Sequence, residues 1–323
     1  MRSSAAAFAL LSAVILVACD APPVAGPIEV DARPWHGDPA PGARLRRLSA
    51  LELRSPLPEF GGFSGLEVSA DGLRIVAISD RGLWFEAKLL RDGDRLVGLA
   101  EPRLRPLTGP DGVAAAFALR DSEGLAIADP ALAGPRVVSF ERVPRLGGFD
   151  GPSAAERALP GPERIEADHP NEGLEALAVS PEGKLLAVRE RPSTGEESFR
   201  AWWIAPDGAV TPTAVPQLGP KMAVGADFAP DGRLILLTRT FSRALGFRFA
   251  LWRFRVEGDA LVEGEILLDA PPGDDADNAE GVATWRDGAG RTRILVVTDD
   301  NASLMQRTLL IEFALPMEAG ETP

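Results

Sequence analysis

The sequence has little of what several familiar kinds of site are built from. It contains one cysteine, Cys19, and two histidines, His36 and His169, so no disulfide can form within the chain and a zinc site is not expected. A catalytic triad of Ser64 and His169 is disfavoured, because Ser64 does not lie in a Gly-x-Ser-x-Gly elbow. No glycine-rich phosphate-binding loop follows a predicted strand and opens a helix.

The chain also lacks clusters of positive charge. Its 34 basic residues are outnumbered by 47 acidic ones, which gives a net charge of −13, and no basic cluster is interleaved with aromatic residues. Nucleic acid and anionic membrane surfaces are therefore not expected as main partners. Glutamates gathered at repeated motifs favour a cation instead.

Helical periodicity is missing as well, since no apolar pattern with a period of 3.6 extends beyond about ten residues outside the N-terminus. Instead, five stretches share one plan of glycine-centred motif, short apolar run, turn and second apolar run. They span residues 64–82, 122–142, 171–192, 224–241 and 279–301, with motif glycines Gly65, Gly124, Gly173, Gly225 and Gly281. A spacing of about fifty residues is typical of a repeat fold.

Several of these units continue with two more β-rich runs, and four antiparallel strands in about fifty residues form one blade of a β-propeller. The last unit supplies only three strands, and we expect the segment 43–54 to provide the fourth. The sequence thus predicts an all-β propeller over residues 43–318, in which an N-terminal strand closes the last blade. Five blades are expected, and the proline-rich joints leave room for a sixth.

The N-terminal residues predict where in the cell the protein is located. Residues 1–19 have the form of a signal peptide and end in Leu-Val-Ala-Cys, which resembles the lipobox of bacterial lipoproteins. Lipidation of Cys19 would tether the protein to the periplasmic face of a membrane in the bacterial cell envelope. Residues 20–42, which are rich in proline, are expected to form an extended linker. An ordinary secretory cleavage site is the alternative.

Acidic residues recur at two places beside the motif glycines. Glu123, Glu172 and Glu280 come just before a glycine, whereas Glu67, Glu175 and Asp227 come two residues after one. The first strand of each propeller blade lines the central channel, so these carboxylates are candidate ligands for Ca²⁺, which takes six to eight oxygens. The alternative is that they bond to backbone N–H groups of neighbouring blades and hold the ring together.

A second cluster lies where the second strands end. It comprises Asp80, Arg81, Glu141, Arg142, the run 189–191, Arg239, Asp299, Asp300 and Asn301. Acids alternating with arginines can hold a metal beside an anionic group, although ion pairs between blades are the simpler interpretation. The run 274–278, Asp-Asp-Ala-Asp-Asn, lacks the glycine and distant glutamate of an EF-hand, so we expect a solvated loop.

Together these motifs resemble a known family. GGFSGLEVSADG, DSEGLAI, NEGLEALAV, VGADFAPDGRLILLTR and AEGVATW followed by TDDNASLMQRTLL, in this order over residues 44–316, are similar to the phytase-like, "esterase-like activity of phytase" family. The resemblance implies a secreted or lipid-anchored propeller related to phytases that use calcium in a carboxylate-rich channel. It implies metal-site roles for Glu67, Asp80, Glu123, Glu172, Glu175, Asp227, Glu280, Asp299 and Asp300.

The sequence therefore predicts a monomeric, calcium-dependent hydrolase of phosphate or carboxylic esters with a small anionic or ester substrate. Arg81, Arg142 and Arg191 would hold the anionic group, and His169 would be a loop residue or a phosphate contact. Two alternatives stay open. One is a non-catalytic envelope propeller that binds a protein or glycan, and the other is a sugar-lactone hydrolase.

Overall fold

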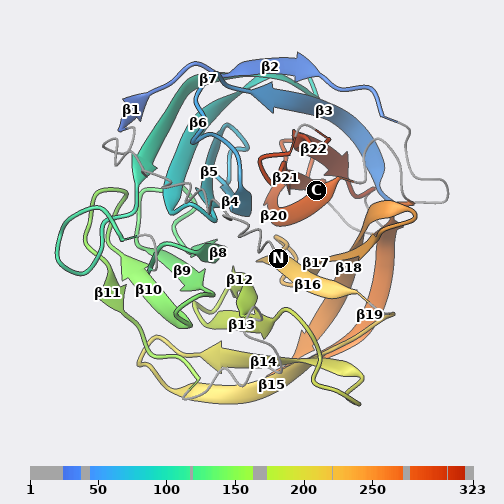
Figure 1. Cartoon of the computed structure of the whole chain (residues 1–323). Helices are drawn as coiled ribbons and strands as arrows, with labels where there is room; N and C mark the ends of the chain where they lie inside the picture. Colours follow the sequence, from blue (N-terminus) through green and yellow to red (C-terminus); the bar gives the residue numbers. More distant parts are fainter. Residues whose placement is uncertain are drawn as a thin grey trace, which may run out of the picture.

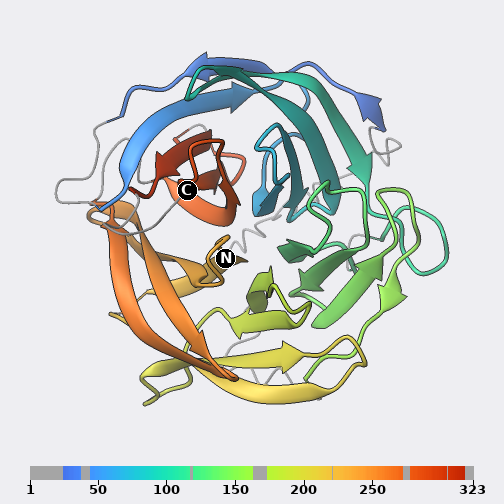
Figure 2. The same ribbon diagram turned by 180° about the vertical axis from the view of Figure 1, so that it is seen from behind.

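Five antiparallel sheets surround a central axis in the computed structural model of the chain (Figures 1 and 2). The structure describes residues 25–37, 44–116, 119–162, 173–219, 221–271, 277–303 and 305–316. The predicted β-propeller is confirmed, and the described residues form five blades rather than six. Within these residues, no helix is long and apolar enough to cross a membrane.

Each blade is a meander that starts at the axis and moves outward. Blade 1 contains β4 (Phe63–Val68), β5 (Arg74–Ser79), β6 (Leu83–Asp92) and β7 (Arg95–Pro106). Blade 2 contains β8 (Ser122–Ile127), β9 (Arg136–Phe140), β10 (Arg145–Phe149) and β11 (Arg157–Ala158). Blade 3 contains β12 (Leu174–Val179), β13 (Leu185–Arg189), β14 (Ser198–Ile204) and β15 (Val210–Pro216).

Blade 4 contains β16 (Met222–Phe228), β17 (Leu234–Ser242), β18 (Gly246–Glu257) and β19 (Ala260–Asp269). Blade 5 contains β20 (Asn278–Arg286), β21 (Thr292–Asp299), β22 (Thr308–Ala314) and, from the N-terminal part of the chain, β3 (Arg46–Arg54). The inner strands consist of short apolar runs because both of their faces are buried against neighbouring blades. In the outer strand β6, buried and exposed residues alternate over its second half.

The ring is closed by an N-terminal strand, as the sequence predicts. β3 pairs antiparallel with β22, for example Leu51 with Leu310, so the first and last parts of the chain share one sheet. This pairing covers the edge that β22 would otherwise expose to another chain.

Part of the predicted linker belongs to the propeller. β1 (Gly26–Pro27) pairs with the outer edge of β7, and β2 (Asp31–Pro34) pairs with the outer edge of β3. The expectation of a linker over all of residues 20–42 is therefore wrong for residues 26–34. Proline is tolerated here because these are edge strands, in which one side of the backbone needs no ladder partner.

A β-bulge near the start of each inner strand corrects the alignment of the repeats. The bulge falls between Phe63 and Gly65 in blade 1, between Ala279 and Gly281 in blade 5, and between Leu174 and Ala176 in blade 3. Ala176, and not Gly173, therefore occupies the position of the other motif glycines. The expected match of Glu172-Gly173 to the other units is wrong, because strand pairing aligns Glu175 with Glu123 and Glu280 instead.

A buried ion-pair network reinforces the closure. The Glu312 side chain of β22 is fully buried and lies 2.5 Å from Nη2 of Arg293 on β21 and 3.0 Å from Nη1 of Arg91 on β6. It also accepts a hydrogen bond from Ser49 on β3. One carboxylate thus joins the two neighbouring strands of blade 5 to the closing strand and to blade 1.

Glu312→Gln is expected to lower the free energy of unfolding by about 3 kcal/mol, because it removes the fully buried carboxylate that Arg293 and Arg91 share and leaves Arg293 only Asp287 and the exposed Asp94. Urea unfolding followed by circular dichroism measures this change. The matched control is Glu263→Gln, which removes an exposed partner of Arg255 and should cost less than about 1 kcal/mol. Equal losses in the two variants would contradict a special role for Glu312.

Candidate active site

The central channel has two mouths with different chemistry. All inner strands run in the same direction along the axis, so they begin at one mouth and end at the other. We call the mouth where β4, β8, β12, β16 and β20 begin the first mouth and the other the second mouth. The second strands, which run antiparallel to the inner ones, end at the first mouth.

The first mouth contains a cavity of about 590 Å³ that is dominated by carboxylates. Two arginines, Arg142 and Arg239, line it together with Ser64, Gly62 and Asn301. The acidic lining residues are Asp80, Asp121, Glu123, Glu141, Glu175, Glu190, Glu280 and Asp299. Every blade contributes at least one side chain, so the cavity exists only in the closed ring.

The bulges place the inner set of acids. Glu123, Glu175 and Glu280 lie at the bulges of blades 2, 3 and 5, where the extra residue breaks the alternation of side chains along the strand. In blade 1 the same position holds Ser64, whose hydroxyl donates to the carbonyl of Ser122 in blade 2 over 2.7 Å. The Ser64 hydroxyl is therefore engaged in a contact between blades.

Burial and mutual repulsion make these carboxyls weak acids. Burial, followed by the charges of Asp121 and Glu190, raises the pKa of Glu141 to about 7. The pKa of Asp299 is raised to about 6, mainly by burial, and burial outweighs the opposing effect of Arg239 to raise the pKa of Glu280 to about 8. Several groups at this mouth thus change protonation state near neutral pH.

Glu123 and Glu175 carry the least compensated carboxyls. Burial raises the pKa of both, and the next cause is a neighbouring glutamate in each case: Glu175 acts on Glu123, and Glu190 acts on Glu175. Neither side chain makes a hydrogen bond or ion pair with another residue that the structure describes. A cation bound at this mouth would relieve their repulsion.

Arg239 of β17 supplies an internal countercharge. Its Nη1 donates to the carboxylate of Glu280 and to Oδ1 of Asn278. Burial opposes the charge of this guanidinium, but Glu280, Glu175 and Glu190 outweigh that effect and raise its pKa. Arg239 belongs to the second cluster of acids and arginines predicted from the sequence, and its contact with Glu280 is the ion pair between blades that was the simpler interpretation of that cluster.

Asn278 corrects another expectation. Its side chain is buried and donates through Nδ2 to Glu280 over 2.9 Å and to Asp299 over 3.4 Å. Asp277 is also buried and accepts a hydrogen bond from the backbone N–H of Arg307. The prediction of a solvated loop at 274–278 is therefore wrong for these two residues, while residues 274–276 lie outside the described part of the chain.

Two of the predicted metal ligands lie at the other end of the channel. Glu67 and Asp227 line a cavity of about 480 Å³ at the second mouth. Glu67 accepts a hydrogen bond from Ile127 N in blade 2, and Asp227 accepts bonds from N and Oγ1 of Thr284 in blade 5. Both carboxylates thus tie their blade to a neighbour. Burial raises the pKa of Asp227 to about 7.

The remaining predicted residues fall at or near the first mouth. Asp80 and Asp299 line the cavity, and Asp300 follows directly and accepts a hydrogen bond from Ala302 N. Arg142 lines the cavity and pairs with Asp121 over 3.1 Å.

Two predicted arginines make contacts at the edge of this mouth. Arg81 donates to the carbonyl of Pro58 over 2.6 Å, and Arg191 lies 3.3 Å from Glu190. Cys19, His169 and Glu172 lie outside the described residues. Asp121 and Asn278 are the site residues that the sequence analysis missed, and their only signal was their position just before a repeat motif.

The donor set at the first mouth fits a hard divalent cation in type and charge. Carboxylate and amide oxygens are the ligands that calcium prefers. Neither Glu123 nor Glu175 makes a hydrogen bond or ion pair with another described side chain, and the charge of Arg239 offsets only part of the repulsion on Glu175. Yet within the described part of the chain no three Asp, Glu, His or Cys side chains converge as a metal-binding group. Carboxylates that repel one another are expected to stay apart until a cation draws them together.

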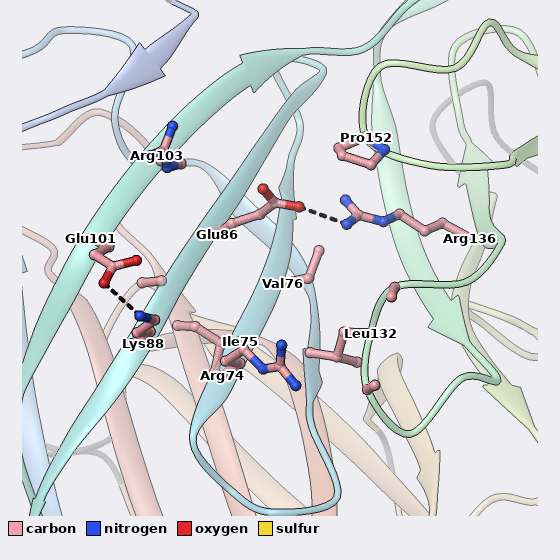
Figure 3. Close-up of a pocket in the computed structure, with 13 residues that line it drawn as sticks. Arg74, Ile75, Val76, Glu86, Lys88, Glu101, Arg103, Leu132, Arg136 and Pro152 are labelled. Carbon is pink, nitrogen blue, oxygen red and sulfur yellow. Dashed lines mark hydrogen bonds and ion pairs between the residues drawn. The ribbon is translucent and has the colours of Figure 1, made fainter.

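A further cavity of about 400 Å³ lies on the side of the propeller between blades 1 and 2 (Figure 3). Its charges are largely paired, because Arg136 donates to Glu86 over 2.6 Å and Lys88 donates to Glu101. Arg136 also stacks on the Trp84 ring at 4.9 Å. None of the predicted site residues lines this cavity, so it is better explained as packing between two blades.

Comparison with known proteins identifies a family. Residues 58–302 match the model of the family described as "Phytase-like: Esterase-like activity of phytase". No curated protein matches the sequence. An endo-arabinase from Bacteroides thetaiotaomicron VPI-5482 is similar in structure, with 13% identity, a TM-score of 0.48, and coverage of 83% of this chain and 98% of that chain.

A gluconolactonase from Xanthomonas campestris, XC5397, is also similar in structure. It has 14% identity and a TM-score of 0.42, and the match covers 90% of this chain and 97% of that chain. At such identities and TM-scores, neither similarity carries an argument about function.

The raised pKa values predict a stability that depends on pH. Glu280 and Glu141 hold protons in the folded state up to pH values near 8 and 7, whereas in the unfolded chain they release them near 4.5. The free energy of unfolding in EDTA should therefore fall as the pH rises through this window, by more than about 1.4 kcal/mol, the equivalent of one pKa unit. Glu280→Gln should flatten the profile, and an unchanged slope in that variant would contradict the assignment.

Proposed function

Because this chain belongs to the phytase-like family, whose model covers residues 58–302, we propose that it is a hydrolase of phosphate or carboxylic esters. The observation that carries this proposal is the cavity of about 590 Å³ at the first mouth. Blades 1, 2, 3 and 5 line it with acids, and Arg239 of blade 4 and Arg142 of blade 2 add two guanidinium groups. Groups that titrate near neutral pH and lie beside guanidinium groups in a cleft are typical of catalytic sites.

The hydrolase of this proposal depends on calcium. Glu123, Glu175 and Glu280, with Asp80 and Asp299, would hold the ion, since they line one cavity and Glu123 and Glu175 make no hydrogen bond or ion pair with another described side chain. When bound, calcium would polarise the ester and lower the pKa of a water molecule. The second-mouth pair, Glu67 and Asp227, takes no part in this site.

The protein's own side chains supply the remaining functions. Arg142, which is half exposed, binds an anionic substrate group through its guanidinium, because N–H groups in a planar fork match phosphate and carboxylate oxygens. Arg239 stays bound to Glu280 and fixes its position. The carboxyl of Glu141, with a pKa of about 7, accepts or donates a proton at its Oε atoms near neutral pH.

Glu175→Gln is expected to lower kcat/KM by about 10²-fold or more while leaving the fold intact, because the amide keeps the shape of the side chain and removes its charge. The measurement uses aryl phosphates and aryl esters as substrates in the presence of calcium. The matched control is Glu67→Gln at the second mouth, which should keep its activity.

If Glu175→Gln lowers the melting temperature but leaves the activity unchanged, the carboxylates at this mouth are structural. The alternative of a non-catalytic propeller would then be favoured, in line with the contact of Arg239 with Glu280. A turnover that appears with sugar lactones and not with aryl esters or phosphates would favour the lactone hydrolase.

Calcium is expected to raise the melting temperature of the EDTA-treated protein by several degrees, because a ligand that binds only the folded state stabilises it by mass action. Thermal unfolding with increasing calcium measures the effect. Glu280→Gln should reduce the rise, and Glu67→Gln should leave it unchanged. No rise in the wild type would remove calcium from the proposal.

The proposal places the enzyme in the bacterial cell envelope, anchored through Cys19 on the periplasmic face of a membrane. Cys19→Ser is expected to move the protein from the membrane fraction to the soluble fraction and to remove the added mass of the acyl chains. Cell fractionation and mass spectrometry test both. A Cys19→Ser variant that fractionates like the wild type would contradict the anchor.

A further inference from the structure

The most exposed large apolar side chains of the described residues lie on the first-mouth side of the propeller, spread around the ring. Met305, Leu245, Val113 and Phe241 are 85%, 62%, 59% and 56% exposed, and no other large apolar residue that the structure describes exceeds 46%. Phe241 lies near the end of the second strand β17, Leu245 and Met305 lie in loops that follow second strands, and Val113 lies in the loop between β7 and β8. Both kinds of loop belong to the first mouth.

Two of these side chains, Phe241 and Leu245, lie on the hairpin tip between β17 and β18. Phe241 pairs with Phe247 across the two strands, and their ring centroids lie 4.8 Å apart. The backbone N–H of Leu245 donates to the carbonyl of Ser242, which closes the turn. Arg243 is exposed between Phe241 and Leu245. An aromatic ring, an aliphatic chain and an arginine on one hairpin tip suit the boundary between apolar chains and phosphate groups.

The N-terminal part of the chain reaches the propeller at this same mouth. β7 ends at the first mouth, and β1 runs antiparallel to it with Gly26 opposite Leu104. β1 therefore begins near the first mouth and runs toward the second. Cys19 is only seven residues before Gly26, so it lies within about 25 Å of it even when fully extended.

This reach is short compared with the height of the blade. From Leu104 to the other end of β7 at Arg95 the strand covers about 30 Å, which exceeds the reach of the segment between Cys19 and Gly26. A membrane that holds Cys19 can therefore lie flat against the first mouth but not against the second.

We infer that the first mouth rests on the lipid bilayer, with Phe241, Leu245, Met305 and Val113 inserted among the headgroups. The inference rests on the anchor at Cys19 proposed above. Arg243 is exposed on the same side of the propeller, where it meets lipid phosphates. The acidic cavity then opens toward the headgroup layer, which selects amphipathic ester or phosphate substrates that are presented at the bilayer surface.

The test uses the full-length lipidated chain in vesicles of phosphatidylethanolamine with a minority of phosphatidylglycerol. Single cysteines replace Leu245, Met305 or, as the control at the second mouth, Leu73, which is 46% exposed. Each carries an environment-sensitive fluorophore, and Cys19 does not react because its sulfur carries the lipid. Labels at Leu245→Cys and Met305→Cys should shift to the blue and be quenched several-fold more strongly by quenchers attached to lipids than the label at Leu73→Cys.

Equal quenching at both mouths, or stronger quenching at Leu73→Cys, would overturn the inference. A blue shift without quenching by lipid would show that protein covers this mouth and would overturn it too. A chain that carries no lipid on Cys19 would remove the anchor and with it the inference. The hydrolase proposal would stand, because its assays use soluble substrates.

Discussion

Pairing of β3 with β22 is the contact on which the rest of the structure depends. Without it, blade 5 would lack its outer strand and the sheet would keep an open edge. Glu312 strengthens this closure by joining β21, β22 and β3 to blade 1 within one buried network. Because the acids of the first mouth come from separate blades, their cavity forms only when the ring is closed.

Closure has an electrostatic cost that shapes the candidate site. Bringing Glu123, Glu175 and Glu280 to one mouth buries charges that repel one another, and burial with repulsion raises their pKa values. Arg239 offsets part of this cost through its contact with Glu280. The remaining repulsion favours binding of a proton or a cation by these carboxyls, and a hydrolytic site requires groups with this property.

The two mouths show how one type of residue can take different roles within a repeat. Glu67 and Asp227 bond to backbone N–H groups of the next blade, and this is the structural role that the sequence analysis left open for such acids. Glu175 resembles them in the spacing from a glycine, yet the bulge in β12 places it with Glu123 and Glu280. The polar loops of the first mouth also hold the exposed apolar side chains, so the candidate site and the inferred membrane contact share one surface.

The sequence by itself determined the propeller, its five repeats and the closing strand, because apolar runs split by turns at a period of about fifty residues leave few other ways to bury both faces of each strand. It also identified most residues of the first mouth through the strand ends at Asp80, Glu141 and Asp299. Only the tertiary structure decided which acids share a mouth, since strand pairing puts Ala176, three residues after Gly173, at the position of the other motif glycines, and spacing from Gly173 conceals this. It alone showed that Arg239 and Asn278 both bond to Glu280, because these contacts join segments about forty residues apart or depend on burial that no local pattern records.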